Sequence, residues 1–180
     1  MKNKPYLIIL TGPESTAKST LSGQLARKLE GHCYPEYARS YLQQNGPDYS
    51  YADVQAIAQH QLAQFKEAQS FDGPFVFFDT WLLITKIWFE WHFKKMPDWI
   101  EPAICTNRAD LYLLCRPDIP WVPDPLRENG GAQRKQLFEI YKKELIRYQL
   151  PFLEVGGQGD ERLKNALECL RTEFVFDHEK

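Results

Sequence analysis

A short stretch near the start of the chain constrains its fold more than any other feature. Residues 6–10 form an apolar run that is too short for a helix and is followed by a Gly-Pro turn, which predicts a buried strand. Beyond the turn, Leu21, Leu25 and Leu29 recur at helical spacing and predict an amphipathic helix. A strand, a glycine turn and a helix in this order are the context in which a phosphate-binding loop occurs.

The turn itself has the spacing of such a loop. It runs Gly12-Pro13-Glu14-Ser15-Thr16-Ala17-Lys18-Ser19-Thr20. Backbone N–H groups of the loop and the N-terminus of the next helix would cradle phosphate groups, with Lys18 on the β- and γ-phosphates and the Ser19 hydroxyl on Mg²⁺. We therefore expect a nucleoside triphosphate at Gly12–Thr20. The alternative is an ordinary turn, which would leave Lys18 at a helix N-terminus, where a cation is unfavourable without an anion.

One residue of the loop departs from the pattern. Ala17 stands where the pattern has glycine. Its methyl group is harmless if the backbone angle φ is negative there, and costs about 1 kcal/mol or more if φ must be positive.

Charged side chains follow the second predicted strand, residues 32–35. Glu36, Tyr37 and Arg39 lie where this strand passes into a helix. Ligands of open α/β sheets bind outside the carboxyl ends of the strands, so we expect Glu36, Tyr37 and Arg39 to face a bound substrate. The alternative is a surface ion pair between Glu36 and Arg39, which would stabilise the helix only slightly.

A third apolar strand, residues 75–80, carries the carboxylate of Asp79 near its end. In enzymes with a phosphate-binding loop, an Asp in this position holds Mg²⁺ or serves as a base. Asp79 could instead cap the helix predicted over residues 81–95. Trp81 lies close to Asp79 in the sequence, and we expect it to stack on a flat ring.

The helix predicted over residues 52–71 is polar and rich in glutamine. Its apolar face comprises Val54, Ile57, Ala58, Leu62 and Phe65. The glutamines and His60 are expected to face solvent.

Residues 116–134 are too long for a passive connection and predict a functional lid. The segment holds four prolines, a Gly-Gly pair and three arginines. Arg127 and Arg134 are expected to close over the phosphates, because arginines on a lid stabilise the charge of a transferring phosphoryl group. A solvated basic loop is the alternative.

The length of the chain and its net charge limit the classes of protein to which it can belong. A chain of 180 residues predicts one domain over residues 1–180. The net charge of −2 argues against nucleic acid held mainly through its phosphates. The four cysteines form no CxxC pair, and the first strand begins too early for a targeting peptide, so we expect a cytoplasmic protein. Charged residues interrupt the apolar run from Phe75 to Phe93, so we expect no membrane span.

Together these stretches resemble the nicotinamide riboside kinase domain of bifunctional NAD-biosynthesis regulators, within a wider set of phosphate-loop ATPases. The stretches that carry the resemblance are the loop from Gly12 to Leu21, Pro35-Glu36-Tyr37-Ala38-Arg39 with Tyr41-Leu42, Asp79-Thr80, Asp110-Leu111-Tyr112-Leu113-Leu114, and Pro120-Trp121-Val122 with Asp124, Leu126 and Arg127. They follow the order of that family and are spread over most of the chain.

The resemblance implies an α/β fold of three layers, in which a five-stranded parallel sheet carries helices on both faces, as in nucleoside and nucleoside-monophosphate kinases. It implies ATP with Mg²⁺ and transfer of the γ-phosphoryl group to a ribosyl 5′-hydroxyl. Glu36 and Asp79 compete for the role of base, and similar nucleoside kinases favour Glu36, which leaves Asp79 on the metal. A cationic nicotinamide ring would suit an aromatic face, for which Trp81 and Trp121 are the candidates.

Two other functions stay open at this level. The chain could phosphorylate a different nucleoside or nucleotide, or it could be a regulatory module that binds ATP and hydrolyses it slowly. The acceptor and the oligomeric state do not follow from the sequence. The adenylyltransferase and DNA-binding modules of the bifunctional proteins have no counterpart in these residues, so dinucleotide synthesis and repression are not expected.

Overall fold

The computed structural model describes residues 4–122 and 132–174. Its strands are β1 (Tyr6–Thr11), β2 (His32–Tyr34), β3 (Phe75–Asp79), β4 (Leu111–Cys115) and β5 (Phe152–Val155). Its helices are α1 (Lys18–Lys28), α2 (Tyr37–Asn45), α3 (Tyr51–Ala68), α4 (Leu82–Trp88), the π-helical segment η1 (Phe89–Phe93), α5 (Ile100–Thr106), α6 (Ala132–Arg147) and α7 (Asp160–Glu173).

All five strands are parallel and lie in the order β2-β3-β1-β4-β5, which places β1 at the centre. In the registers of β1, Leu10 lies opposite Asp79 and Thr11 lies opposite Leu114. The carboxyl ends of the three central strands therefore meet at one edge of the sheet, where ligands of such sheets bind.

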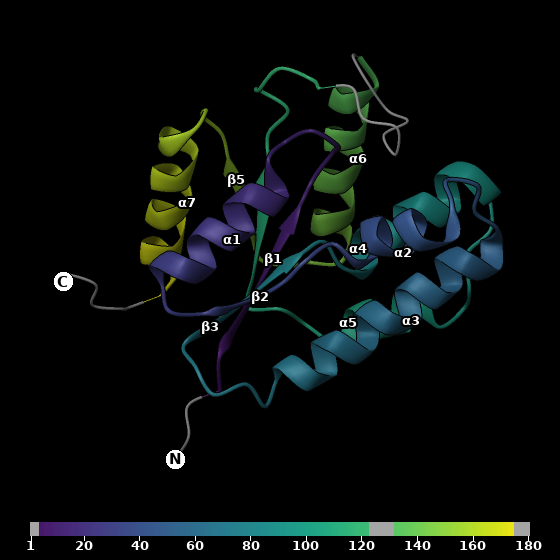
Figure 1. Cartoon of the computed structure of the whole chain (residues 1–180), viewed down its shortest axis with the longest axis horizontal. Helices are drawn as coiled ribbons and strands as arrows, with labels where there is room; N and C mark the ends of the chain where they lie inside the picture. The colour runs from purple at the N-terminus through teal and green to yellow at the C-terminus, as the bar shows by residue number, and fades with distance from the viewer. Residues whose placement is uncertain (1–3, 123–131, 175–180) are drawn as a thin grey trace.

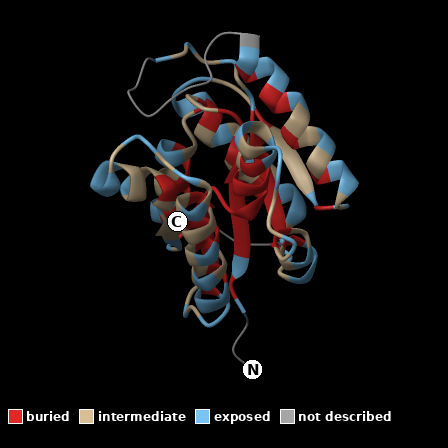
Figure 2. Ribbon diagram, turned by 90° about the vertical axis from the view of Figure 1, so that its right-hand side faces the viewer, coloured by how far each residue is buried: buried red, intermediate tan, exposed pale blue. Residues whose placement is uncertain are grey.

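Alternating side chains of the strands enter two separate cores. Ile8, Leu10 and Phe77 belong to a core formed with α1 and α7. Leu7 and Ile9 point to the opposite face, into the larger core under α3, α4, α5 and α6. Figure 1 shows α1 and α7 together on one side of the sheet and α6 on the other. Figure 2 shows the buried strands between these layers. The predicted three-layer α/β architecture is confirmed.

The helix predicted over residues 81–95 differs from the structure. Trp81 has extended backbone angles, α4 begins at Leu82, and after Trp88 the chain continues as the π-helical segment η1. A π-helical turn contains more residues than an α-helical one and occurs frequently at functional sites. Here it carries Trp91 and His92. None of the described helices is long and apolar enough to cross a lipid bilayer.

Candidate active site

The loop after β1 lies tightly against the end of β4. Gly12 has φ of 126°, and a Cβ atom at this position would come within 2.7 Å of the Cys115 carbonyl oxygen. Only glycine combines that backbone angle with such a close approach. The position of the loop on the sheet therefore depends on Gly12.

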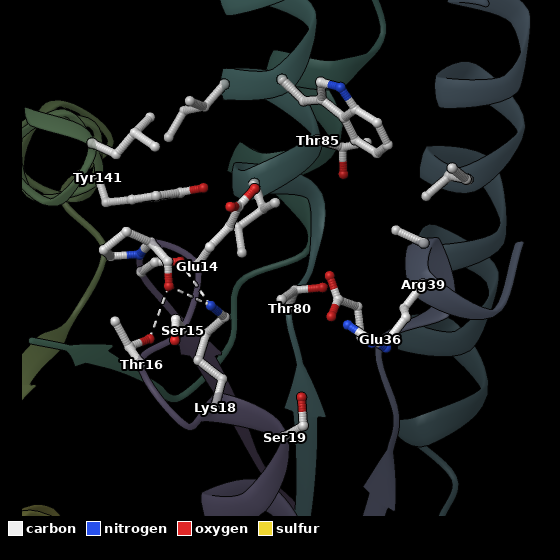
Figure 3. Close-up of a pocket in the computed structure, with 18 of the residues that line it drawn as sticks. Glu14, Ser15, Thr16, Lys18, Ser19, Glu36, Arg39, Thr80, Thr85 and Tyr141 are labelled. Atoms are coloured by element: carbon white, nitrogen blue, oxygen red, sulfur yellow. Dashed lines mark hydrogen bonds between the residues drawn. The ribbon is translucent and has the colours of Figure 1, made fainter. Parts of the chain in front are cut away.

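The side chain of Lys18 donates hydrogen bonds to the backbone of the loop that contains it. The Nζ atom of Lys18 donates hydrogen bonds to the carbonyl oxygens of Gly12, at 3.0 Å, and Pro13, at 2.7 Å, and the Thr16 hydroxyl also donates to Pro13 (Figure 3). Lys18 begins α1, so its ammonium group lies beside the positive end of the helix dipole. Two positive groups at one place favour an anion, as the motif predicts.

Two buried arginines donate hydrogen bonds to the backbone carbonyl oxygens of the loop. From α6, Arg134 donates to the carbonyl oxygen of Ser15 at 2.8 Å and to that of Ile119 at 3.1 Å. Arg162, from α7, donates to the carbonyl oxygens of Thr16 and Arg116, both at 3.1 Å. These bonds tie the loop to the start of the predicted lid. The structure thus gives Arg134 a positioning role, and the predicted contact with phosphate stays a prediction.

Ala17 adopts the left-handed conformation, with φ of 59° and ψ of 26°. Its φ is therefore positive, which is the case in which the methyl group of Ala17 strains the backbone. Thr80, directly after β3, also has a positive φ of 74°, which is rare for a β-branched residue. Strained backbone of this kind concentrates at functional sites, where the surrounding structure maintains it.

Glu36 and Asp79 lie close enough to influence each other. Burial raises the pKa of Glu36, the negative charge of Asp79 raises it further, and Lys18 and Arg39 oppose the shift. Burial likewise raises the pKa of Asp79, against the effects of Lys18, Ser19 and Arg39. Figure 3 shows Glu36 and Arg39 beside Thr80 at the same edge of the sheet as Lys18. The structure thus brings together Lys18, Ser19, Glu36, Arg39 and Asp79.

A cavity of about 440 Å³ lies beside this cluster, and all of its members except Asp79 line it. One end is formed by residues 12–20, and Glu36, Arg39 and Thr80 also line it. The other end carries aromatic side chains that we call the aromatic wall, which are Tyr49, Trp88, Trp91 and His92. Tyr49 packs edge-on against Trp88, with 4.7 Å between ring centroids. The cavity is therefore polar at the loop and aromatic at the far end.

Several predicted residues do not line this cavity. Trp81 is 1% exposed and stacks on Phe65 in the core, so the prediction that it binds a ring is wrong. Tyr37 stacks on His60 at 3.6 Å between centroids and is also absent from the lining. Trp121 lies at the start of the predicted lid and does not line the cavity as described. Arg127 lies outside the described residues.

The aromatic wall and one glutamine were missed from the sequence. Gln61 was expected to face solvent, yet it is 3% exposed and lines the cavity. Its spacing from Val54 and Ile57 places it on the buried face of α3, which is the feature that could have identified it. No pattern in the sequence distinguishes Trp88 and Trp91 from core residues, because the π-helical turn that carries Trp91 depends on tertiary packing.

A family model described as AAA domain matches residues 7–162. The chain belongs to this AAA domain family. The trifunctional NAD biosynthesis/regulator protein NadR of Escherichia coli is 27% identical over 177 residues, which cover 93% of this chain and 43% of the relative. NadR of Salmonella typhimurium is 26% identical over the same shares. The chain thus spans less than half the length of these relatives.

Solved structures share the fold of this AAA domain. NadR protein in complex with NR matches with a TM-score of 0.79 at 20% identity, over 98% of this chain and 52% of that one. A deoxyadenosine kinase from M. mycoides matches with a TM-score of 0.65 at 16% identity, over 92% of this chain and 99% of that one. The predicted resemblance to the NAD-biosynthesis regulators is confirmed by the NadR relatives. The predicted fold class, that of the nucleoside kinases, is confirmed as well.

The angle at Ala17 gives a prediction for this AAA domain. Because the left-handed conformation strains alanine and not glycine, Ala17→Gly should raise the free energy of unfolding by about 1 kcal/mol. The thermal midpoint should rise by about 2–4 °C for a domain of this size, as measured by calorimetry.

A second alanine serves as the matched control. Ala63 is exposed within α3, where glycine should lower the free energy of unfolding by about 1 kcal/mol. An Ala17→Gly protein that is no more stable than the wild type would contradict the strain at this position.

Proposed function

We propose that this chain is an ATP-dependent kinase that transfers the γ-phosphoryl group to the 5′-hydroxyl of a nucleoside, with nicotinamide riboside as the substrate. The observation that carries the proposal is the continuous cavity. It joins the phosphate-binding loop to the aromatic wall, and Glu36 lies along it. A donor nucleotide and an acceptor nucleoside could therefore meet within one space, next to a carboxylate.

The relatives support the same choice of substrate. The NadR proteins named above are NAD biosynthesis proteins, and a NadR structure contains NR, which we take to be nicotinamide riboside. Another NadR structure is described in complex with NAD and AMP-PNP. Because this chain matches less than half of the NadR sequence, we propose only the kinase activity and no other function of those proteins.

The loop binds the triphosphate in this mechanism. Its N–H groups and the N-terminus of α1 surround the phosphates, and Lys18 moves from the carbonyl oxygens of its own loop to the β- and γ-phosphate oxygens. The two arginines behind the loop, Arg134 and Arg162, keep its backbone in place. Positioning and electrostatic stabilisation of this kind supply most of the catalysis in phosphoryl transfer.

Ser19 and Asp79 have the chemistry to hold Mg²⁺. Both carboxylate oxygens of Asp79 are buried. Ser19 lies close enough to lower the pKa of Asp79, yet neither oxygen has a well-formed hydrogen bond to a described residue, which is costly unless a cation or proton is bound. Mg²⁺ prefers one or two such oxygen ligands together with water and phosphate oxygens. When bound, it would neutralise the charge that develops on the phosphoryl group.

Glu36 is placed to orient the nucleoside. It is the N-cap residue of α2, at the carboxyl end of β2, and it lines the cavity. We assign it the role of base that accepts the proton of the 5′-hydroxyl, with Arg39 beside it as a substrate-binding group. In a loose transition state such a base acts mainly by orienting the hydroxyl.

The aromatic wall would bind the ring. A pyridinium cation is attracted to the faces of Trp and Tyr by about 0.5–2 kcal/mol. Trp88 and Trp91 take the role that the sequence had suggested for Trp81 and Trp121. We place the activity in the cytoplasm, because the four cysteines are all free thiols, which suits a reducing compartment.

A panel of nucleosides tests the proposal. With ATP and Mg²⁺, nicotinamide riboside should stimulate ADP release more than any other nucleoside, and Lys18→Ala should abolish that release while the thermal midpoint is kept. Preference for another nucleoside would correct the substrate alone. ATP binding without stimulation by any nucleoside would point to a regulatory ATPase.

The two carboxylates should separate by substitution. Glu36→Gln should lower turnover by about 10²–10⁴-fold and keep its dependence on Mg²⁺, as expected for loss of a base. Asp79→Asn should instead raise the Mg²⁺ concentration needed for half-maximal rate. Steady-state kinetics with Mg²⁺ titration measures both, and unchanged kinetics in either variant would remove the role assigned to that residue.

The pH profile provides a further check on Glu36. A base must be deprotonated to act, and burial raises its pKa, so activity should rise with pH through a midpoint above the ordinary value for glutamate. In Glu36→Gln this acid limb should be lost or displaced. An identical acid limb in the variant would assign the titration to another group.

A further inference from the structure

The cavity contains one polar pair that the mechanism above does not use. Gln61 of α3 and Thr85 of α4 are 3% and 1% exposed, and both line the cavity. The Thr85 hydroxyl donates a hydrogen bond of 2.5 Å to the Oε1 atom of Gln61. This bond joins the two helices and fixes the amide group of Gln61.

That bond satisfies only part of the amide. A glutamine side chain has an acceptor oxygen and two N–H donors. With Oε1 taken by Thr85, the Nε2 group of Gln61 donates no hydrogen bond to any residue in the described part of the chain. Because Gln61 lines the cavity, a ligand bound there can accept a hydrogen bond from this amide donor, which would otherwise be left without a partner once the ligand displaces water.

The pair lies at the aromatic end of the cavity. Trp88 follows Thr85 by three residues in α4, so the two share one side of that helix, and His92 of η1 lines the same cavity. Figure 3 shows Thr85 well away from Ser19, with Thr80 and Glu36 between them. A group bound by Gln61 would therefore belong to the ring of the nucleoside and not to its reacting hydroxyl.

We infer that Gln61, held by Thr85, is a specificity-determining residue that donates a hydrogen bond to a carbonyl oxygen on the ring of the acceptor nucleoside. The inference rests on the proposed function and deepens it. For nicotinamide riboside the accepting group is the carboxamide oxygen. Thr85 is a positioning residue, because it acts only through the amide of Gln61.

Two substrates and one substitution separate this contact from general packing. Gln61→Met keeps the length of the side chain and removes both amide donors. It should lower kcat/KM for nicotinamide riboside about tenfold, as expected for loss of one hydrogen bond to substrate. It should leave kcat/KM unchanged for pyridinium riboside, which has the same charged ring and ribose but no carboxamide.

Three variants complete the comparison. Gln59→Met, at an exposed position of the same helix, should behave as wild type with both substrates. Thr85→Val keeps the shape and removes the hydroxyl, so it should lose activity selectively with nicotinamide riboside, whereas Thr85→Ser should restore it. Thermal unfolding of each variant would show that the fold is kept.

The outcomes distinguish the inference from the proposed function. A selective loss for nicotinamide riboside in Gln61→Met supports the contact. Equal losses for both substrates, or no loss for either, would show that Gln61 does not recognise the ring, while the kinase activity of the wild type would stand. If wild-type protein phosphorylates neither riboside, the proposed function itself fails and the inference fails with it.

Discussion

The parallel pairing of β1 with β3 on one side and β4 on the other is the constraint on which the site depends. Because Leu10 lies opposite Asp79 in this register, the loop that begins at Gly12 emerges beside the carboxylate at the end of β3. On the other side, the end of β4 supplies the Cys115 carbonyl oxygen against which Gly12 packs. A shift of one residue in either register would turn the side chains of the shifted strand to the opposite face of the sheet, and the groups of the site would no longer meet.

Buried arginines couple the loop to the rest of the site. Arg134 and Arg162 come from helices on opposite faces of the sheet, and each donates to a loop carbonyl and to the segment after β4. Ser15 is a shared point, because its hydroxyl also accepts a hydrogen bond of 3.1 Å from the Val122 N–H. Movement of the segment after β4 would therefore act directly on the phosphate-binding loop.

The parts of the fold and the site that depend on local sequence patterns could be predicted. The loop has a fixed spacing, and the ends of parallel strands must meet at one edge, so Lys18, Ser19, Glu36, Arg39 and Asp79 could be grouped without coordinates. The orientation of the other side chains depends on how neighbouring helices pack, which no local pattern shows. Trp81 was assigned to a ring because it is near Asp79 in the chain, but its extended backbone turns the side chain onto Phe65. Gln61 was assigned to solvent because of its residue type, although its helical position is buried.

Phosphoryl transfer between two substrates in one cavity is the central claim, and phosphorus NMR of the reaction products tests it most directly. With ATP, Mg²⁺ and nicotinamide riboside, the account predicts ADP and one phosphomonoester whose phosphorus couples to the 5′-methylene protons of the riboside. Formation of ADP with inorganic phosphate alone would contradict it, because the terminal phosphoryl group would then have passed to water and not to the nucleoside.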